Sequence, residues 1–244
     1  METIVWILYT GFIIFIVYGI LPTVMFRTMS MGLIKKGQNQ NTLALTFDDG
    51  PNPHYTPQVL DLLKQYQCKA TFFLIAEKAL EHPDLVKRIV AEGHIIGIHH
   101  YAHTNSWLLS PTATKREIGE SAAILEKITG EKPGFYRPPY GRMNVFTLWF
   151  SKDYRIVLWS SIFQDWKKQD ADVLFGKMRK RLGHGEIFLL HDDGSNPNAD
   201  EIAPESTIEA LRNFIPEALA QGYKCVNLHE HLKGKSVEEQ KRIL

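Results

Sequence analysis

The chain has 244 residues, of which 44% are hydrophobic and 23% are charged, and its 28 basic residues almost balance its 27 acidic residues. This composition, with a net charge of +1, excludes a disordered tail protein and a nucleic-acid binder that depends on a strongly basic surface. Two cysteines, Cys68 and Cys225, are too few for a disulfide framework and can pair only if the fold brings them together.

The first predicted element is an apolar helix at the N-terminus. The 24 residues from Thr3 to Phe26 include no Asp, Glu, Lys or Arg. A helix of that length runs about 36 Å, against about 30 Å of membrane hydrocarbon. We therefore predict that residues 1–27 are a transmembrane anchor that contacts the lipid bilayer through residues 3–26. A cleaved signal peptide, whose apolar region is usually shorter, and a buried core helix are the alternatives.

The charges on either side of this helix predict its orientation. Arg27, Lys35 and Lys36 follow the apolar run, whereas Glu2 and the amino terminus cancel before it. The positive-inside rule therefore favours a cytoplasmic location for the rest of the chain.

The chain after the anchor is predicted to form one domain. Residues 28–41 are a polar linker, residues 42–232 are long enough for a sizeable core, and residues 233–244 are a polar C-terminal tail. Short apolar runs predict strands at 43–47, 70–75, 94–98, 134–137, 155–160, 186–191 and 223–227. Amphipathic runs predict helices at 57–67, 82–92, 114–129, 145–152, 171–182 and 204–221. This alternation indicates an α/β fold with a parallel sheet, either doubly wound or closed into a barrel.

Polar side chains gather where the predicted strands end. They are Asp48, Asp49, His99, His103, Arg137, Asp165, Trp166 and His191. Because the carboxyl ends of parallel strands open onto one face, we expect these residues to converge there.

These residue types suit metal-assisted hydrolysis of an acyl bond. His99 and His103 are four residues apart, and one carboxylate would complete a set with an open position for water. Asp48 and Asp49 are adjacent, so one can bind the metal while the other acts as a base. A guanidinium such as Arg137 would keep that base ionised.

A second group would serve as the acid. His191, from another strand, could donate a proton on the opposite side of the substrate, and Asp165 would keep it protonated. Together with the metal and the base, this completes the parts needed for the reaction.

Five motifs follow one another along the chain. They are TFDDGP (46–51), HHYAH (99–103), RPPYG (137–141), the Asp165-Trp166 pair and LLH (189–191). In this order they resemble the motifs of NodB-type polysaccharide deacetylases, carbohydrate esterase family 4. The resemblance covers about residues 42–230. It implies an irregular (β/α) barrel of about seven strands, preceded here by one transmembrane helix, and removal of N-acetyl groups from amino sugars.

The resemblance also implies a role for each motif residue. Asp49, His99 and His103 would bind one divalent metal ion, usually zinc in this family, with cobalt or another divalent ion as alternatives. Asp48 would be the general base, oriented by Arg137.

The remaining motif residues would complete the site. The Tyr140 backbone N–H would stabilise the oxyanion, and His191 would be the general acid, tuned by Asp165. Trp166 and Leu189 would form the wall around the acetyl methyl group.

Two positions depart from the family pattern. His100 stands where Ser or Thr is usual, so it could compete as a metal ligand. Ile162 stands where the first Asp of an Asp-x-x-Asp-Trp motif is usual. We expect activity to survive these changes, with an altered substrate preference.

Three functions are compatible with these observations. The leading one is a membrane-anchored, metal-dependent deacetylase of an N-acetylated cell-wall or chitin-like glycan, which would place the domain outside the cytoplasm. The second is a deacylase or deformylase of a lipid-linked amino sugar at the cytoplasmic leaflet, which the basic flank favours. The third is a non-catalytic glycan-binding protein, against which the complete set of catalytic residue types argues. No nucleic acid is expected as a partner, and the oligomeric state is left open.

Overall fold

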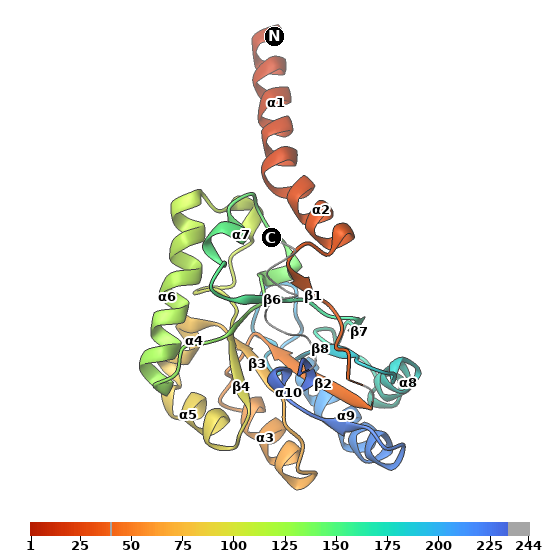
Figure 1. Cartoon of the computed structure of the whole chain (residues 1–244). Helices are drawn as coiled ribbons and strands as arrows, with labels where there is room; N and C mark the ends of the chain where they lie inside the picture. Colours follow the sequence, from red (N-terminus) through yellow and green to blue (C-terminus); the bar gives the residue numbers. More distant parts are fainter. Residues whose placement is uncertain (40, 234–244) are drawn as a thin grey trace.

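A computed structural model of the chain describes residues 1–39 and 41–233 (Figure 1). The predicted C-terminal tail, apart from Lys233, lies outside these residues. The strands form one sheet in which neighbouring strands are parallel, in the order β1-β6-β5-β4-β3-β2-β8-β7, with β9 paired to β2. Their bounds are β1 Leu33–Ile34, β2 Thr42–Asp48, β3 Thr71–Leu74, β4 Ile95–Ile98, β5 Phe135–Tyr136, β6 Arg155–Val157, β7 Ser161–Ile162, β8 Ile187–His191 and β9 Lys224–Cys225.

The helices lie around this curled sheet (Figure 1). They are α3 Tyr55–Gln65, α4 Ala76–Glu81, α5 Pro83–Ala91, α6 Pro111–Thr129, α7 Thr147–Phe150, α8 Ala171–Arg181, α9 Ala203–Ala220 and α10 Leu228–His231, with 3-10 turns η2 Ser106–Leu108 and η3 Pro139–Gly141. Their ends follow ordinary capping chemistry: Ser110 accepts the Ala113 N–H at the start of α6, and Gly130, with φ +79°, ends it.

The centre of the sheet positions the site. Strands β2 and β8 are buried along almost their whole length, and large apolar side chains such as Phe47, Phe72 and Phe188 fill the space between the sheet and the helices. In the register of these two strands Asp48 pairs directly with His191. Two functional candidates from distant parts of the sequence therefore end adjacent strands.

This architecture confirms the predicted irregular (β/α) barrel, with some differences in detail. The described part of the chain has nine strands rather than about seven, because the two-residue strands β1 and β7 were not predicted. Such short strands carry no periodicity that a sequence pattern can reveal. Leu33 and Ile34, placed in the linker by their sequence neighbours, belong to the sheet, where they pair with β6. Cys68 and Cys225 are buried, free thiols.

The N-terminal segment forms one apolar helix that projects away from the sheet (Figure 1). It consists of α1 (Glu2–Phe15), a π-helical turn η1 (Ile16–Ile20) and α2 (Leu21–Met29). Within residues 1–39 and 41–233, this is the one helix long and apolar enough to cross a membrane, with a mean hydropathy of 2.4 in its most apolar window. The side chains before Phe15 are exposed.

The second half of this helix is bonded to the domain through Thr23. The buried Thr23 hydroxyl donates to the Met143 carbonyl at 2.7 Å. It accepts the Met143 N–H at 2.9 Å and the Trp107 indole N–H at 2.8 Å. All of its hydrogen-bonding capacity is therefore used on the domain.

A further hydrogen bond joins the domain to the N-terminal helix where the backbone hydrogen bonding of that helix is interrupted. Pro22 has no N–H to donate to the Tyr18 carbonyl, four residues earlier, and the Val145 N–H donates to that carbonyl at 3.1 Å. Gly19 is buried one turn away, and a Cβ there would lie 3.0 Å from the Trp107 indole. The absent side chain lets the indole pack against the helix backbone.

Candidate active site

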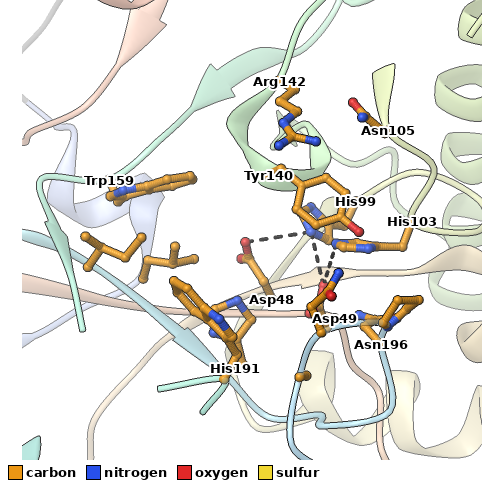
Figure 2. A pocket seen from close by; sticks show the side chains of 16 residues that line it. Asp48, Asp49, His99, His103, Asn105, Tyr140, Arg142, Trp159, His191 and Asn196 are labelled. Carbon is orange, nitrogen blue, oxygen red and sulfur yellow. Dashed lines mark ion pairs between the residues drawn. The ribbon is translucent and has the colours of Figure 1, made fainter. Parts of the chain in front are cut away.

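A cavity of about 460 Å³ opens at the carboxyl ends of β2 and β8 (Figure 2). The predicted site residues that line it are Asp48, Asp49, His99, His103, Tyr140, Trp166, Leu189 and His191. The other two, Arg137 and Asp165, lie behind Asp48 and His191 respectively. The structure therefore brings all ten predicted residues together.

Asp49, His99 and His103 form a compact group of metal-ligand type. Asp49 Oδ1 lies 3.3 Å from His99 Nε2 and 3.1 Å from His103 Nε2. Burial by itself raises the pKa of Asp49, but the adjoining imidazoles of His103 and His99 outweigh burial and hold that pKa well below its usual range. The carboxylate is therefore ionised when it faces the two rings.

The donor set fits a divalent cation. Asp49 Oδ1 is buried and has no hydrogen-bond partner of acceptable geometry, as expected for an atom that serves as a metal ligand. His99 Nδ1 lies 2.7 Å from the Arg137 carbonyl, which requires a proton on Nδ1 and leaves the Nε2 lone pair facing the group. The separations are close to the roughly 3.4 Å between two ligands of one tetrahedral ion.

The loop that carries the two histidines is held by Glu117 on α6. The buried Glu117 carboxylate accepts the N–H groups of Tyr101 at 2.8 Å and Ala102 at 3.3 Å. His103 has φ +54°, in the left-handed region, so the loop needs such external support. Sequence reasoning missed Glu117 because it lies in the middle of an ordinary amphipathic helix.

His100 does not compete for the metal, contrary to the possibility raised by the sequence. Its ring is buried, with Nδ1 3.0 Å from the Thr104 carbonyl and Nε2 2.7 Å from the Tyr136 hydroxyl. Burial lowers the pKa of His100 to about 3, so the ring is neutral and donates through only one nitrogen. His100 therefore has a structural role, because its ring joins Thr104 to Tyr136 beneath the loop.

Asp48 is positioned by a buried guanidinium. Arg137 is fully buried and donates through Nη1 to Asp48 Oδ1 at 2.6 Å and to Thr46 Oγ1 at 2.8 Å. Its other nitrogens donate to the carbonyls of Val157 and Leu158. The second Asp48 oxygen lies 3.8 Å from His99 Nε2 and is therefore presented to the metal-ligand group.

His191 lies on the other side of Asp48 from the two ligand imidazoles (Figure 2). Its Nδ1 is 2.9 Å from Asp165 Oδ1, and its backbone N–H donates to Asp165 Oδ2 at 2.7 Å. Burial by itself lowers the pKa of His191, but Asp165, with Asp49 and Asp48 farther away, raises it to about 9. The imidazole is therefore protonated at neutral pH, with Nδ1 facing Asp165 and a proton also on Nε2.

Tyr140 lies in the tight turn of the RPPYG motif, with φ +59°. The N–H groups of Gly141 and Arg142 donate to the carbonyls of Pro138 and Pro139, and these bonds fix the turn. The Tyr140 ring packs at 4.7 Å from the His103 ring, beside the metal-ligand group. Across the cavity, Trp166 packs edge-on against His191 at 5.4 Å.

Several lining residues were not singled out in the sequence. Arg142 enters the cavity wall with its guanidinium 4.4 Å from the Trp107 ring centroid and 5.0 Å from that of Tyr140. Trp159, Asn105 and Asn196 also line the cavity (Figure 2). Arg142 directly follows RPPYG, and Trp159 is the penultimate residue of the predicted strand 155–160. Their positions in the sequence therefore gave a usable signal for these two residues only.

Comparisons with known proteins agree with the geometry. A family model described as polysaccharide deacetylase matches residues 35–159. A peptidoglycan-N-acetylglucosamine deacetylase of Bacillus cereus is 38% identical over 201 residues, which cover 81% of this chain and 91% of that protein. The crystal structure of the Bc1960 peptidoglycan N-acetylglucosamine deacetylase is similar with a TM-score of 0.78 at 34% identity, covering 86% of this chain and 97% of the other.

A further similar structure is that of wild-type BA3943 from Bacillus anthracis, described as a pseudoenzyme of carbohydrate esterase family 4. It has a TM-score of 0.74 at 29% identity and covers 84% of this chain and 70% of the other. The fold is thus shared by active and inactive proteins. With its five motifs gathered around one cavity, a matching family model and relatives similar over most of their length, this chain belongs to the polysaccharide deacetylase family and is a deacetylase-type hydrolase of amide bonds.

Proposed function

We propose that the chain is a metal-dependent deacetylase that removes N-acetyl groups from amino-sugar residues of a cell-wall glycan. The observation that carries this proposal is the convergence of Asp49, His99 and His103, with Asp48 beside them and the protonated His191 opposite. The peptidoglycan deacetylase similar to this chain over most of its length supports the choice of substrate class.

The side chains divide the reaction between them. A divalent cation, which we propose to be zinc, would polarise the acetamide carbonyl and acidify the attacking water when bound by Asp49, His99 and His103. Asp48, oriented by its ion pair with Arg137, takes the proton of the attacking water.

Other residues stabilise the negative charge that develops during attack, protonate the leaving amine and bound the acetyl methyl group. The Tyr140 N–H donates a hydrogen bond to the oxygen that gains negative charge during attack. His191 then gives its proton to the sugar nitrogen, which leaves as an amine, and Asp165 stabilises the ring in its charged form before that transfer. Trp166 and Leu189 bound the space for the acetyl methyl group.

The catalytic roles are tested by acetate release from N-acetylglucosamine oligomers and from murein fragments by the purified full chain. We expect Asp48→Asn and His191→Ala each to lower kcat by about 10²–10⁴. Asp84→Asn, at an exposed position on α5, is the matched control and is expected to keep full activity. Unchanged rates in the two site variants would show that these residues do not act as base and acid, and inactivity of the wild type on every glycan would favour a non-catalytic protein.

We further propose that the N-terminal helix anchors the protein and that its domain lies outside the cytoplasm, where a cell-wall glycan is found. Two of the three basic residues that favoured the opposite orientation, Arg27 and Lys36, have partners within the domain. The Arg27 guanidinium lies 5.4 Å from the Trp159 ring centroid, and Lys36 pairs with Glu186 at 2.8 Å. Because these charges have structural roles, they are weaker indicators of membrane orientation.

The orientation can be measured with one introduced thiol. Lys180→Cys places a cysteine at an exposed position on α8, and the native thiols of Cys68 and Cys225 are buried. We expect a membrane-impermeant maleimide to label this variant in intact cells. Labelling only after the cells are permeabilised would support the second function, deacylation of a lipid-linked amino sugar at the cytoplasmic leaflet.

A further inference from the structure

The free part of the N-terminal helix is too short to cross a bilayer. From Thr3 to Ile14 the side chains are exposed and lie before the first contacts with the domain. This stretch is about 18 Å long at the rise of an α-helix, whereas the hydrocarbon of a bilayer is about 30 Å thick. The missing length falls in residues 15–22, where the helix already packs on the domain. A bilayer crossed by this helix must therefore also contact the domain.

The domain is apolar and exposed at this level. Leu108 is 72% exposed and follows Trp107, whose ring packs edge-on against Phe15 at 6.0 Å. Val145 is 50% exposed, and its N–H donates to the Tyr18 carbonyl. Both exposed side chains thus lie beside the part of the helix that has to complete the span.

Helix α7 extends this apolar surface. Figure 1 shows α7 beside the base of the N-terminal helix. Phe146 directly precedes α7, and its ring centroid lies 6.2 Å from that of Tyr18. Trp149, three residues later, is 73% exposed, although a large aromatic side chain normally loses contact with water in a folded protein. Aromatic side chains of this kind are enriched where a membrane meets water.

We propose that Leu108, Val145, Phe146 and Trp149, here called the collar, insert into the lipid bilayer beside the helix. This inference rests on the membrane anchoring proposed above and goes beyond it, because it makes the catalytic domain itself a lipid-binding surface. The occupant is lipid because the collar is continuous with a helix that lipid must already surround. The hydrogen bonds of Thr23 and Tyr18 hold the helix against the domain, so that the collar keeps a fixed depth relative to the bilayer.

The active-site cavity lies close to the part of the helix that packs on the domain. Trp107, between the helix and the domain, packs against Arg142, and Arg142 lines the cavity. Arg27 of the same helix lies over Trp159, another lining residue. Residues of the cavity wall are therefore connected by direct contacts to the part of the helix that leaves the bilayer.

The inference is tested with nitroxide labels on the full chain in vesicles of phosphatidylcholine and phosphatidylglycerol. Single cysteines replace Leu108 and Trp149 in the collar, Ile7 in the free helix, and Val173, a 53% exposed apolar residue on α8, as the matched control. Power-saturation measurements compare collisions of each label with oxygen, which dissolves in lipid, and with a water-soluble nickel chelate. Thermal unfolding of each labelled variant verifies that it is folded.

We expect the ratio of oxygen to nickel collisions to be several-fold higher at positions 108 and 149 than at position 173, and highest at position 7. If positions 108 and 149 match position 173 while position 7 reports lipid, the collar proposal is wrong and the anchor remains. If position 7 reports water, both proposals are wrong. Low collision rates with both reagents at positions 108 and 149 would mean that protein covers the collar, which also overturns the inference.

Discussion

The pairing of His191 with Asp165 determines the pH range of the proposed acid. The folded-state pKa of about 9 exceeds the ordinary value of 6.5, so the charged ring stabilises the fold fully below about pH 6.5, and this contribution is lost as the pH rises through about 9. We expect the rate to fall on the alkaline side near pH 9, because His191 then loses the proton that it must donate.

Asp165→Asn should move this alkaline limb to lower pH. The asparagine keeps the shape of the side chain but removes the largest influence that raises the pKa of His191. The measurement is kcat against pH for the wild type, Asp165→Asn and the control Asp84→Asn. If the alkaline limb lies at the same pH in the wild type and in Asp165→Asn, then the loss of rate is not caused by deprotonation of His191.

His100 is expected to matter for stability and not for metal binding. In His100→Ser the Tyr136 hydroxyl and the Thr104 carbonyl lose their buried partner, which should lower the free energy of unfolding by about 1–3 kcal/mol. Urea unfolding measures this loss, with the exposed His54→Ser as the control. Bound metal per chain should be unchanged, and its loss in His100→Ser would contradict the orientation of the ring.

At the scale of elements, the N-terminal helix acts as a structural part of the domain. We expect Thr23→Val to lower the free energy of unfolding by about 1–3 kcal/mol, because the Met143 and Trp107 groups bonded to the hydroxyl lose their partner. Thr28→Val, which removes an exposed hydroxyl bonded only within the helix, is the matched control. Equal unfolding curves for the two variants would show that the helix is not held through Thr23.

The elements differ in how much of them could be predicted. Strands β2, β3, β4 and β8 were predicted to within one or two residues, because each is a continuous buried apolar run. Helix α4 was missed because it follows β3 directly and has only six residues. The docking of α2 was not predictable, since a threonine in an apolar run gives no sign of partners more than eighty residues away.

The candidate site was predictable to a greater degree than the fold around it. Acidic and imidazole side chains at strand ends, in five spaced motifs, indicated both their convergence and their chemistry. Glu117, which supports the site from an ordinary helical position, and Asn196, which lines the cavity from a loop, carry no chemical signature in sequence. Only the structure relates them to the cavity.

At the scale of the whole molecule, the cation proposed to bind at Asp49, His99 and His103 should stabilise the fold. A ligand that binds only the native state adds about 2.7 kcal/mol when its concentration is a hundred times Kd. We therefore expect chelation to lower the Tm of the full chain and zinc to restore it. His103→Ala, which lacks one of the ligand imidazoles, should show a smaller difference between the two conditions. A wild-type Tm that does not respond to chelator or to zinc would remove the metal from the proposed mechanism.

The short connection between α2 and β1 has a consequence for where such an enzyme could work. Met29 ends the helix and Leu33 already pairs with β6, so the chain has little freedom to swivel between them. If the helix stays in the bilayer, the catalytic cavity cannot reach glycans that lie far from the membrane in a thick cell wall. It would meet substrate by lateral diffusion in the plane of the lipid, and amino sugars laid down next to that plane would be deacetylated while older, more distant layers keep their acetyl groups.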